Sequence, residues 1–263
     1  MDEDPDSTEI SSTINDETDS FSSYDADISS PEEENHNNYF ALNHIYNLRS
    51  QVLKDDVINV MKLTEENSLE AANQMYEKIV SLLNNKTIIQ IQIYGIGVLD
   101  GTCQNRGPFQ LSIVFSLLNR FKEFFPKITV TCQEPKLVDS EKEYLQSKNV
   151  KIFETLKFSS KHFLKALKST KNIISDPAFI CYMIHGAYKI RCIIVGNNPD
   201  IFIDSTDLMY SKYSEKLKEF SKLCESKPLK FEKDSVGDTG IGHKTCIYTI
   251  SKENAEALIC KFP

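Results

Sequence analysis

The ten residues Ile88-Ile-Gln-Ile-Gln-Ile-Tyr-Gly-Ile-Gly97 constrain the fold of this chain more than any other stretch. Apolar residues fill most positions up to Tyr94, and two glycines follow two positions apart, which is typical of a buried strand that runs into a tight turn. A helical pattern begins soon afterwards, near Pro108. Strand, glycine turn and helix in this order open a doubly wound α/β domain, and such a turn lies where these domains bind ligands.

Apolar strand patterns and helical patterns alternate along the rest of the chain. We expect strands at 87–94, 128–132, 150–153, 178–184, 191–195 and 244–250, and helices at 108–125, 139–147, 160–168 and 207–224. Such alternation predicts an α/β fold of the Rossmann-like type, in which helices flank a mostly parallel sheet with right-handed crossovers. We assign this domain to residues 85–263.

Two amphipathic helices are predicted before the first strand. Apolar residues recur at helical spacing over 39–63, and a second helix follows Asn67, a candidate N-cap with Glu70 three positions later. We expect this helical pair, residues 39–84, to pack on one face of the sheet.

The first 38 residues have a different composition from the rest. They contain 13 of the 38 Asp and Glu residues and no Lys or Arg, so the remainder carries 25 acids against 30 bases, about +5. A segment that is rich in Asp, Glu, Ser and Thr cannot bury enough apolar surface to offset its ordering entropy. We therefore predict a disordered acidic tail over 1–38, either a solubilising segment or a target of kinases.

The composition also limits the cellular compartments and the classes of binding partner that we expect for this protein. The seven cysteines form no Cys-x-x-Cys pair and their number is odd, which favours reduced thiols over a disulfide framework or a zinc ribbon. The chain has no secretory leader and no apolar run long enough to span a bilayer, so we expect a soluble protein of the cytoplasm, and of the nucleus as a second compartment. No basic stripe interleaved with aromatic residues marks a nucleic-acid surface.

The glycine turn is the first candidate ligand site. Gly95, Gly97 and Gly101 give the spacing G-x-G-x-x-x-G, one residue longer than the dinucleotide fingerprint. The glycines either let the backbone approach a ligand or merely make the turn. Arg106, in the loop that follows, either pairs with an anion or is solvated.

Polar residues at the predicted ends of other strands are further candidates. Glu134 ends the second strand, where an acid can accept hydrogen bonds from ribose hydroxyls or can simply be solvated. His185 follows the fourth strand and is a base, a ligand to a metal or haem, or a hydrogen-bonded wall residue. Gly196 and Asn197 end the predicted fifth strand and either hold a turn or contact a ligand.

Taken in order, five motifs resemble the sensitivity-to-red-light-reduced family, the SRR-like domain, over roughly residues 85–210. The motifs are Tyr94-Gly-Ile-Gly97, Pro108-Phe-Gln-Leu111, Gln133-Glu-Pro135 with Glu141 downstream, Tyr182-Met-Ile-His185 and Ile194-Val-Gly-Asn197. The family's forms are Y-G-x-G, a Y/F-Q-L-A helix start, D-P with a later E, Y-M-P-H-C and I-G-N-S-F.

The chain departs from this pattern in several places. Glu134 replaces the family's Asp, Ile184 its Pro and Gly186 its Cys, and Asn198-Pro199 replaces Ser-Phe. Only residues 187–190 lie between the His185-Gly186 motif and the predicted fifth strand, too few for a right-handed crossover. We therefore expect a tight turn between these two strands, or one of them outside the sheet. The chain is identified as a divergent member of the family.

The resemblance implies a regulatory protein with a Rossmann-like core. Members are linked to circadian and light signalling, to regulation of haem biosynthesis and to microtubule stability, and no reaction is firmly assigned to the domain. Our first hypothesis is a non-enzymatic protein that binds a small ligand or a protein partner, neither of them identified, through Gly95, Gly97, Arg106, Glu134, His185, Gly196 and Asn197.

Two other hypotheses stay open. In a nucleotide- or S-adenosylmethionine-dependent transferase, Glu134 would hold ribose and His185 would act as a base. In a haem sensor, His185, His243 or Cys103 would bind the iron, although no Cys-Pro dipeptide supports it. The chain contains no G-x-S-x-G elbow, no H-E-x-x-H, no P-loop lysine and no paired-carboxylate signature. The cofactor is therefore unknown, and no set of metal ligands is predicted.

Overall fold

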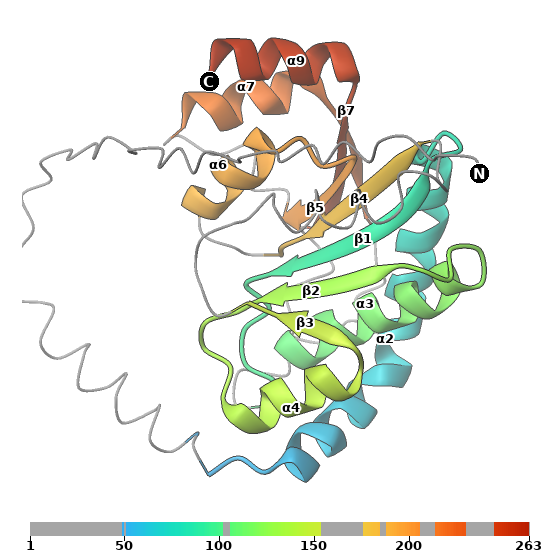
Figure 1. Cartoon of the computed structure of the whole chain (residues 1–263), viewed down its shortest axis with the longest axis vertical. Helices are drawn as coiled ribbons and strands as arrows, with labels where there is room; N and C mark the ends of the chain where they lie inside the picture. The colour runs from blue at the N-terminus through green and yellow to red at the C-terminus, as the bar shows by residue number, and fades with distance from the viewer. Residues whose placement is uncertain are drawn as a thin grey trace, which may run out of the picture. The chain divides into compact units, whose positions relative to one another are not determined.

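A computed structural model gives the arrangement of the chain (Figure 1). The residues that it describes are 49, 51–101, 106–153, 176–184, 188–205, 214–229 and 245–262. All of them belong to one compact unit, residues 45–263. The predicted tail, the predicted helix at 160–168, and the residues Cys103, His185 and His243 lie outside the described residues.

One sheet runs through the centre of the described part. Its seven strands have the order β3-β2-β1-β4-β5-β7-β6. The first five strands in this order are parallel, and β7 and β6 add to the sheet in antiparallel pairing. The strands are β1 (Thr87–Tyr94), β2 (Thr129–Gln133), β3 (Val150–Ile152), β4 (Pro177–Tyr182), β5 (Ile201–Ser205), β6 (Cys224–Pro228) and β7 (Thr245–Ile250). The predicted mostly parallel α/β sheet is therefore confirmed.

Helices cover both faces of this sheet. Their bounds are α2 (Lys54–Leu82), α3 (Arg106–Lys122), α4 (Asp139–Ser147), α6 (Tyr188–Gly196), α7 (Glu215–Leu223) and α9 (Lys252–Lys261). Figure 1 shows α2, α3 and α4 on one side and α6, α7 and α9 on the other. Two buried apolar clusters correspond to these two sides, and successive strand residues alternate between them, as Ile93 and Tyr94 do.

Strand β1 occupies the middle of the parallel part, between β2 and β4. Every residue from Ile88 to Tyr94 is buried, which explains why this stretch has almost no polar alternation. The chain leaves β1 toward α3 on one face and leaves β4 toward α6 on the other. The loops at this switch point diverge, which is the place where doubly wound folds bind ligands.

The predicted break between two helices at residues 63–67 is wrong, because α2 is one continuous helix of 29 residues that runs through it. Thr64 and Ser68 are buried on the inner face of this helix. Because both are polar residues, the apolar pattern of the sequence is interrupted there although the helix continues. The Thr64 hydroxyl meets that of Ser112 on α3 at 2.9 Å, which satisfies both groups in the interface. Asn67 is no N-cap, since its side chain donates to Leu63 O one turn earlier at 3.3 Å.

The predicted fifth strand is also wrong, because residues 191–195 lie in helix α6. Within it Ile194 is buried and Ile193 is exposed, a helical division that a short apolar run does not reveal. The strand comes later, as β5, and pairs with β4 in parallel. Helix α6 is therefore the crossover between β4 and β5, and the expected tight turn, or strand outside the sheet, is not found.

The polar edge strand β6 and helix α9 are two elements that the sequence patterns did not predict. No helix in the described ranges is long and apolar enough to cross a membrane.

Candidate functional site

The glycine turn after β1 requires backbone conformations that favour glycine. Gly95, Gly97 and Gly101 have φ of +61°, +79° and +80°. A Cβ built on Gly95 or Gly97 would meet no atom within 4 Å, so backbone conformation and not crowding demands glycine there. The turn is tied to the next strand, because Gly95 N donates to Gln133 O at 3.2 Å.

A fourth glycine controls how closely α3 approaches this turn. A Cβ on Gly107 would lie well inside van der Waals contact with the carbonyl oxygen of Val98 and 3.0 Å from that of Ile96. Both oxygens belong to backbone, which cannot move aside as a flexible side chain can. The first turn of α3 therefore packs directly on the loop that follows β1.

Glu134 joins the loops that follow β1 and β2. Its Oε2 accepts the amide of Gly97 at 2.9 Å, and its Oε1 accepts the amide of Lys136 at 2.9 Å. The residue is 6% exposed. Each carboxylate oxygen thus already has a backbone donor, and the role that the geometry supports for Glu134 is to hold the glycine turn against the loop after β2.

Glu141 also joins two backbone segments through its carboxylate, and it is more completely buried than Glu134. It is fully buried in the first turn of α4. Its Oε2 accepts the amide of Val138, the residue before the helix, at 2.9 Å, and its Oε1 accepts the amide of Leu99. The same carboxylate therefore caps α4 and fixes the loop after β1.

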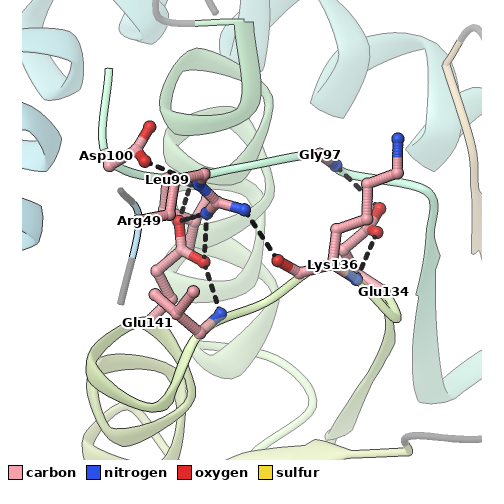
Figure 2. A network of polar contacts seen from close by, with 8 residues as sticks. Arg49, Gly97, Leu99, Asp100, Glu134, Lys136 and Glu141 are labelled. Carbon is pink, nitrogen blue, oxygen red and sulfur yellow. Dashed lines mark hydrogen bonds and ion pairs between the residues drawn. The ribbon is translucent and has the colours of Figure 1, made fainter. Parts of the chain in front are cut away.

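Arg49 completes this network (Figure 2). Its Nε donates to Asp100 Oδ2 at 2.8 Å, its Nη2 to both oxygens of Glu141 at 2.7 and 2.8 Å, and its Nη1 to the carbonyl of Lys136 at 2.8 Å. The three side chains are nearly inaccessible, at 7%, 2% and 0% for Arg49, Asp100 and Glu141. Burial lowers the pKa of Arg49, but the bonds and charges of Asp100 and Glu141 outweigh it and raise the pKa above its usual value.

We call Arg49, Asp100, Glu134 and Glu141 the arginine network. It holds together the glycine turn, the loop after β2, the start of α4 and the segment that precedes α2. Its charges are directed at groups of the chain itself. Its chemistry is therefore that of a clamp, which fixes the shape of the loops at the carboxyl ends of β1 and β2.

Other polar groups at the same end of the sheet have no partner among the described residues. They include Gln110 Oε1, near the start of α3, Gln133 Nε2, at the end of β2, and the hydroxyl of Tyr182, at the end of β4, and Ser140 Oγ at the start of α4 is another. Gln110 is 4% exposed and Tyr182 1%. An acceptor, a donor and a hydroxyl are thus inaccessible and without a partner among the described residues at this end of the sheet.

The remaining predicted site residues lie in different places. Arg106 is exposed at the first position of α3, near the glycine turn in sequence. Gly196 is the last residue of the crossover helix α6, and Asn197 follows it. Both precede β5, so they lie at the amino end of the parallel strands and not with Gly95 and Gly97. Asn197 donates from its side chain to Ile193 O at 2.7 Å, as residues at helix ends do. His185 lies outside the described residues.

Sequence patterns missed two members of the arginine network, Arg49 and Asp100. Arg49 meets Glu141 across 92 positions, and no local motif marks a lone arginine before a helix. Glu141 did appear among the residues that carry the family resemblance. A pair at the end of β5 was missed as well: the inaccessible Asp204 accepts two bonds from Arg191 of α6, at 2.6 and 3.0 Å.

Comparison with known proteins gives one finding. A family model described as the SRR1 domain matches residues 66–255. The match spans most of the chain and includes every strand of the sheet. No curated protein matches the chain significantly.

Proposed function

The chain belongs to the SRR1 domain family, and on this premise we propose that it is a regulatory protein that binds a small ligand or a protein partner at the carboxyl ends of β1, β2 and β4. The observation that carries this proposal is the group of unpaired, inaccessible polar atoms on Gln110, Gln133 and Tyr182. An unsatisfied buried group costs about 1–3 kcal/mol. A ligand that pairs with these atoms recovers that free energy, which is the gain that selective binding needs.

Two charge features favour an anionic ligand. Helix α3 has 17 residues, begins beside the glycine turn, and carries no acidic residue in its first turn. Its amino end therefore presents backbone N–H groups and the positive end of the helix dipole, with exposed Arg106 at the first position. The ligand that we propose has an anionic group for this end of α3, and a donor and an acceptor for the side chains of Gln110 and Gln133.

The finer roles that the resemblance implies belong to the same proposal. Circadian and light signalling, regulation of haem biosynthesis and microtubule stability differ in their outputs, but each needs a step that recognises a ligand or a partner. We propose the cytoplasm as the compartment, with the nucleus as a second one. A transferase is not retained as a second function, because both oxygens of Glu134 already accept backbone amides, which gives this carboxylate a structural role that needs no ribose.

The test is a thermal-shift panel on the full chain. The probes are adenine and nicotinamide nucleotides, S-adenosylmethionine and haemin. A ligand at one hundred times its dissociation constant adds about 2.7 kcal/mol to the free energy of unfolding, which raises the midpoint visibly. We expect one anionic class to raise it.

Variants connect such a shift to the site. Gln110→Leu removes the unpaired acceptor and should abolish the shift, whereas Gln146→Leu, on the exposed side of α4, should leave it intact. His185→Ala tests the remaining predicted residue. Equal shifts in Gln110→Leu and in the unsubstituted chain would contradict this site. If no probe gives a shift, capture of protein partners by the same two variants decides between a partner site and no site.

A further inference from the structure

A groove on the outer side of α2, α3 and α4 is separate from the site proposed above. It has a volume of about 490 Å³ and is lined by the first half of α2, the later turns of α3 and the end of α4. Figure 1 shows these three helices together on one side of the sheet. Because the groove uses α3 beyond its first turn, it does not share Gln110 or the glycine turn.

Three apolar side chains form the floor of this groove, beside polar lining residues such as Ser112, Ser116 and Asn119. Met61 of α2 and Tyr144 of α4 are buried there, and Phe115 of α3 is half-buried between them. The rings of Phe115 and Tyr144 are tilted, with centroids 6.4 Å apart. Phe115 thus leaves part of an aromatic surface open to whatever enters.

The rim of the groove is basic. Lys62, Lys122 and Lys148 lie around it, one from each side, and all three are exposed. None has an ion-pair partner among the described residues, although Lys148 Nζ lies 5.7 Å from the centre of the Tyr144 ring. Glu65 is the acidic residue in the lining. Three unpaired cations around an apolar floor form what we call the lysine groove.

We propose that the lysine groove binds an acidic peptide segment of a partner protein. Carboxylates of the segment pair with the three lysines, and an aromatic or aliphatic side chain of the segment contacts Phe115 and Met61. The proposal rests on charge complementarity and on the apolar floor, since acidic side chains alone do not need such a floor.

A nucleic acid fits the groove less well. Bases stack on open aromatic faces; Tyr144 is only 6% exposed, so the half-buried Phe115 is the one ring of this pair with open surface. Glu65 places a negative charge among the lysines, which a phosphate backbone would have to pass. A peptide with spaced carboxylates can keep its charges away from Glu65, so a peptide is the occupant that the lining favours.

The experiment is fluorescence anisotropy with the full chain at low salt. The probe is a fluorescein-labelled 12-residue peptide of Glu and Asp with one central Phe, and a second probe has Ala in place of Phe. We expect saturable binding of the first probe and weaker binding of the second. The triple variant Lys62→Glu, Lys122→Glu, Lys148→Glu should lower the affinity roughly tenfold or more, because it removes three charge pairs.

A matched variant changes the same net charge elsewhere. Lys54, Lys127 and Lys252 are exposed and do not line the groove, so their change to Glu should leave the affinity within about twofold. An equal loss in both triple variants would show that net charge alone attracts the probe and would overturn the proposal. Thermal midpoints of both variants verify that each is folded.

Three further results would also overturn it. Equal affinity for the Phe and Ala probes would mean that the apolar side chains of the groove do not contribute to peptide binding. Tighter binding of a single-stranded oligonucleotide of equal length would assign the groove to nucleic acid. Binding of the probe only after the 13 acids of residues 1–38 are replaced by neutral residues would identify that segment, and not a partner, as the occupant.

Discussion

The arginine network and the lysine groove use positive charge in opposite ways. Arg49 is inaccessible, and it donates to Asp100, to Glu141 and to the carbonyl of Lys136. The three lysines of the groove are exposed and lack ion-pair partners among the described residues. A charge whose bonds all go to its own chain determines the fold, whereas a charge with no bond in the chain is available to another molecule. The expected effects of substitution therefore fall on stability in the first region and on binding in the second.

The largest expected effect is at Arg49. Arg49→Met removes the cation that pairs with the inaccessible carboxylates of Asp100 and Glu141, which should lower the free energy of unfolding by about 3–5 kcal/mol. The measurement is urea denaturation of the full chain followed by circular dichroism. Arg120→Met is the matched control. The half-buried Arg120 guanidinium lies 3.8 Å from the centre of the Tyr76 ring and donates to Asn73 Oδ1, so its loss should cost about 1 kcal/mol or less. Equal losses of stability in Arg49→Met and Arg120→Met would show that the buried ion pairs of Arg49 do not make it special for the fold.

A smaller loss is expected where α3 packs on the loop after β1. Alanine in a helix is normally better than glycine by about 1 kcal/mol, but at Gly107 its Cβ would clash with the carbonyl of Val98. Gly107→Ala should therefore destabilise by about 1–3 kcal/mol. Gly196→Ala is a sharp control, because its Cβ would meet only the flexible end of Lys216 at 2.9 Å. A lower denaturation midpoint for Gly196→Ala than for Gly107→Ala would show that the loop after β1 can move away from α3 at little cost.

The lysine groove should give almost no stability effect. Changing Lys62, Lys122 and Lys148 to Glu breaks no ion pair within the described ranges, so each substitution should stay within about 0.5 kcal/mol. The readout is the same denaturation measurement as for Arg49→Met. A loss comparable to that of Arg49→Met would mean that these lysines are structural, which would break the comparison.

The last expected effect is a change of stability at alkaline pH, and it concerns Tyr144 on the floor of the groove. Burial, with the nearby charge of Glu65, raises the pKa of Tyr144 from 10.0 to about 12. Because the folded-state pKa lies above the unfolded one, the stability that the neutral phenol contributes is complete below pH 10 and is lost as the pH rises toward 12. A spectroscopic titration of the phenolate should show one late-titrating tyrosine fewer in Tyr144→Phe. In Glu65→Gln, the Tyr144 pKa should fall below about 12.

Much of the parallel sheet could be predicted because its signals are local. The apolar run of β1 and the amphipathic pattern of α4 gave the observed bounds, Thr87–Tyr94 and Asp139–Ser147. The errors arose where tertiary packing decides. Thr64 and Ser68 hid the continuity of α2, and the apolar run at 191–195 became the crossover helix because parallel strands β4 and β5 need one.

The candidate site could be predicted only in part for a related reason. Glycines at positive φ and an acid at a strand end are local features, so Gly95, Gly97 and Glu134 were found, and the structure does bring them together. Gly196 and Asn197 were misplaced together with the wrongly predicted strand. Arg49 was missed because its importance comes from partners 51 and 92 positions away.

Arg49 has one more consequence, for where a fragment of this chain that keeps its charge balance has to begin. The family match starts at residue 66, within α2, while the cation that balances Asp100 and Glu141 lies 17 positions earlier. A shortened protein cut at the family boundary would keep every strand and lose that cation. The stretch that the family model matches and the stretch that carries these ion pairs are thus different lengths of chain, and we expect a stable recombinant fragment to begin before Arg49.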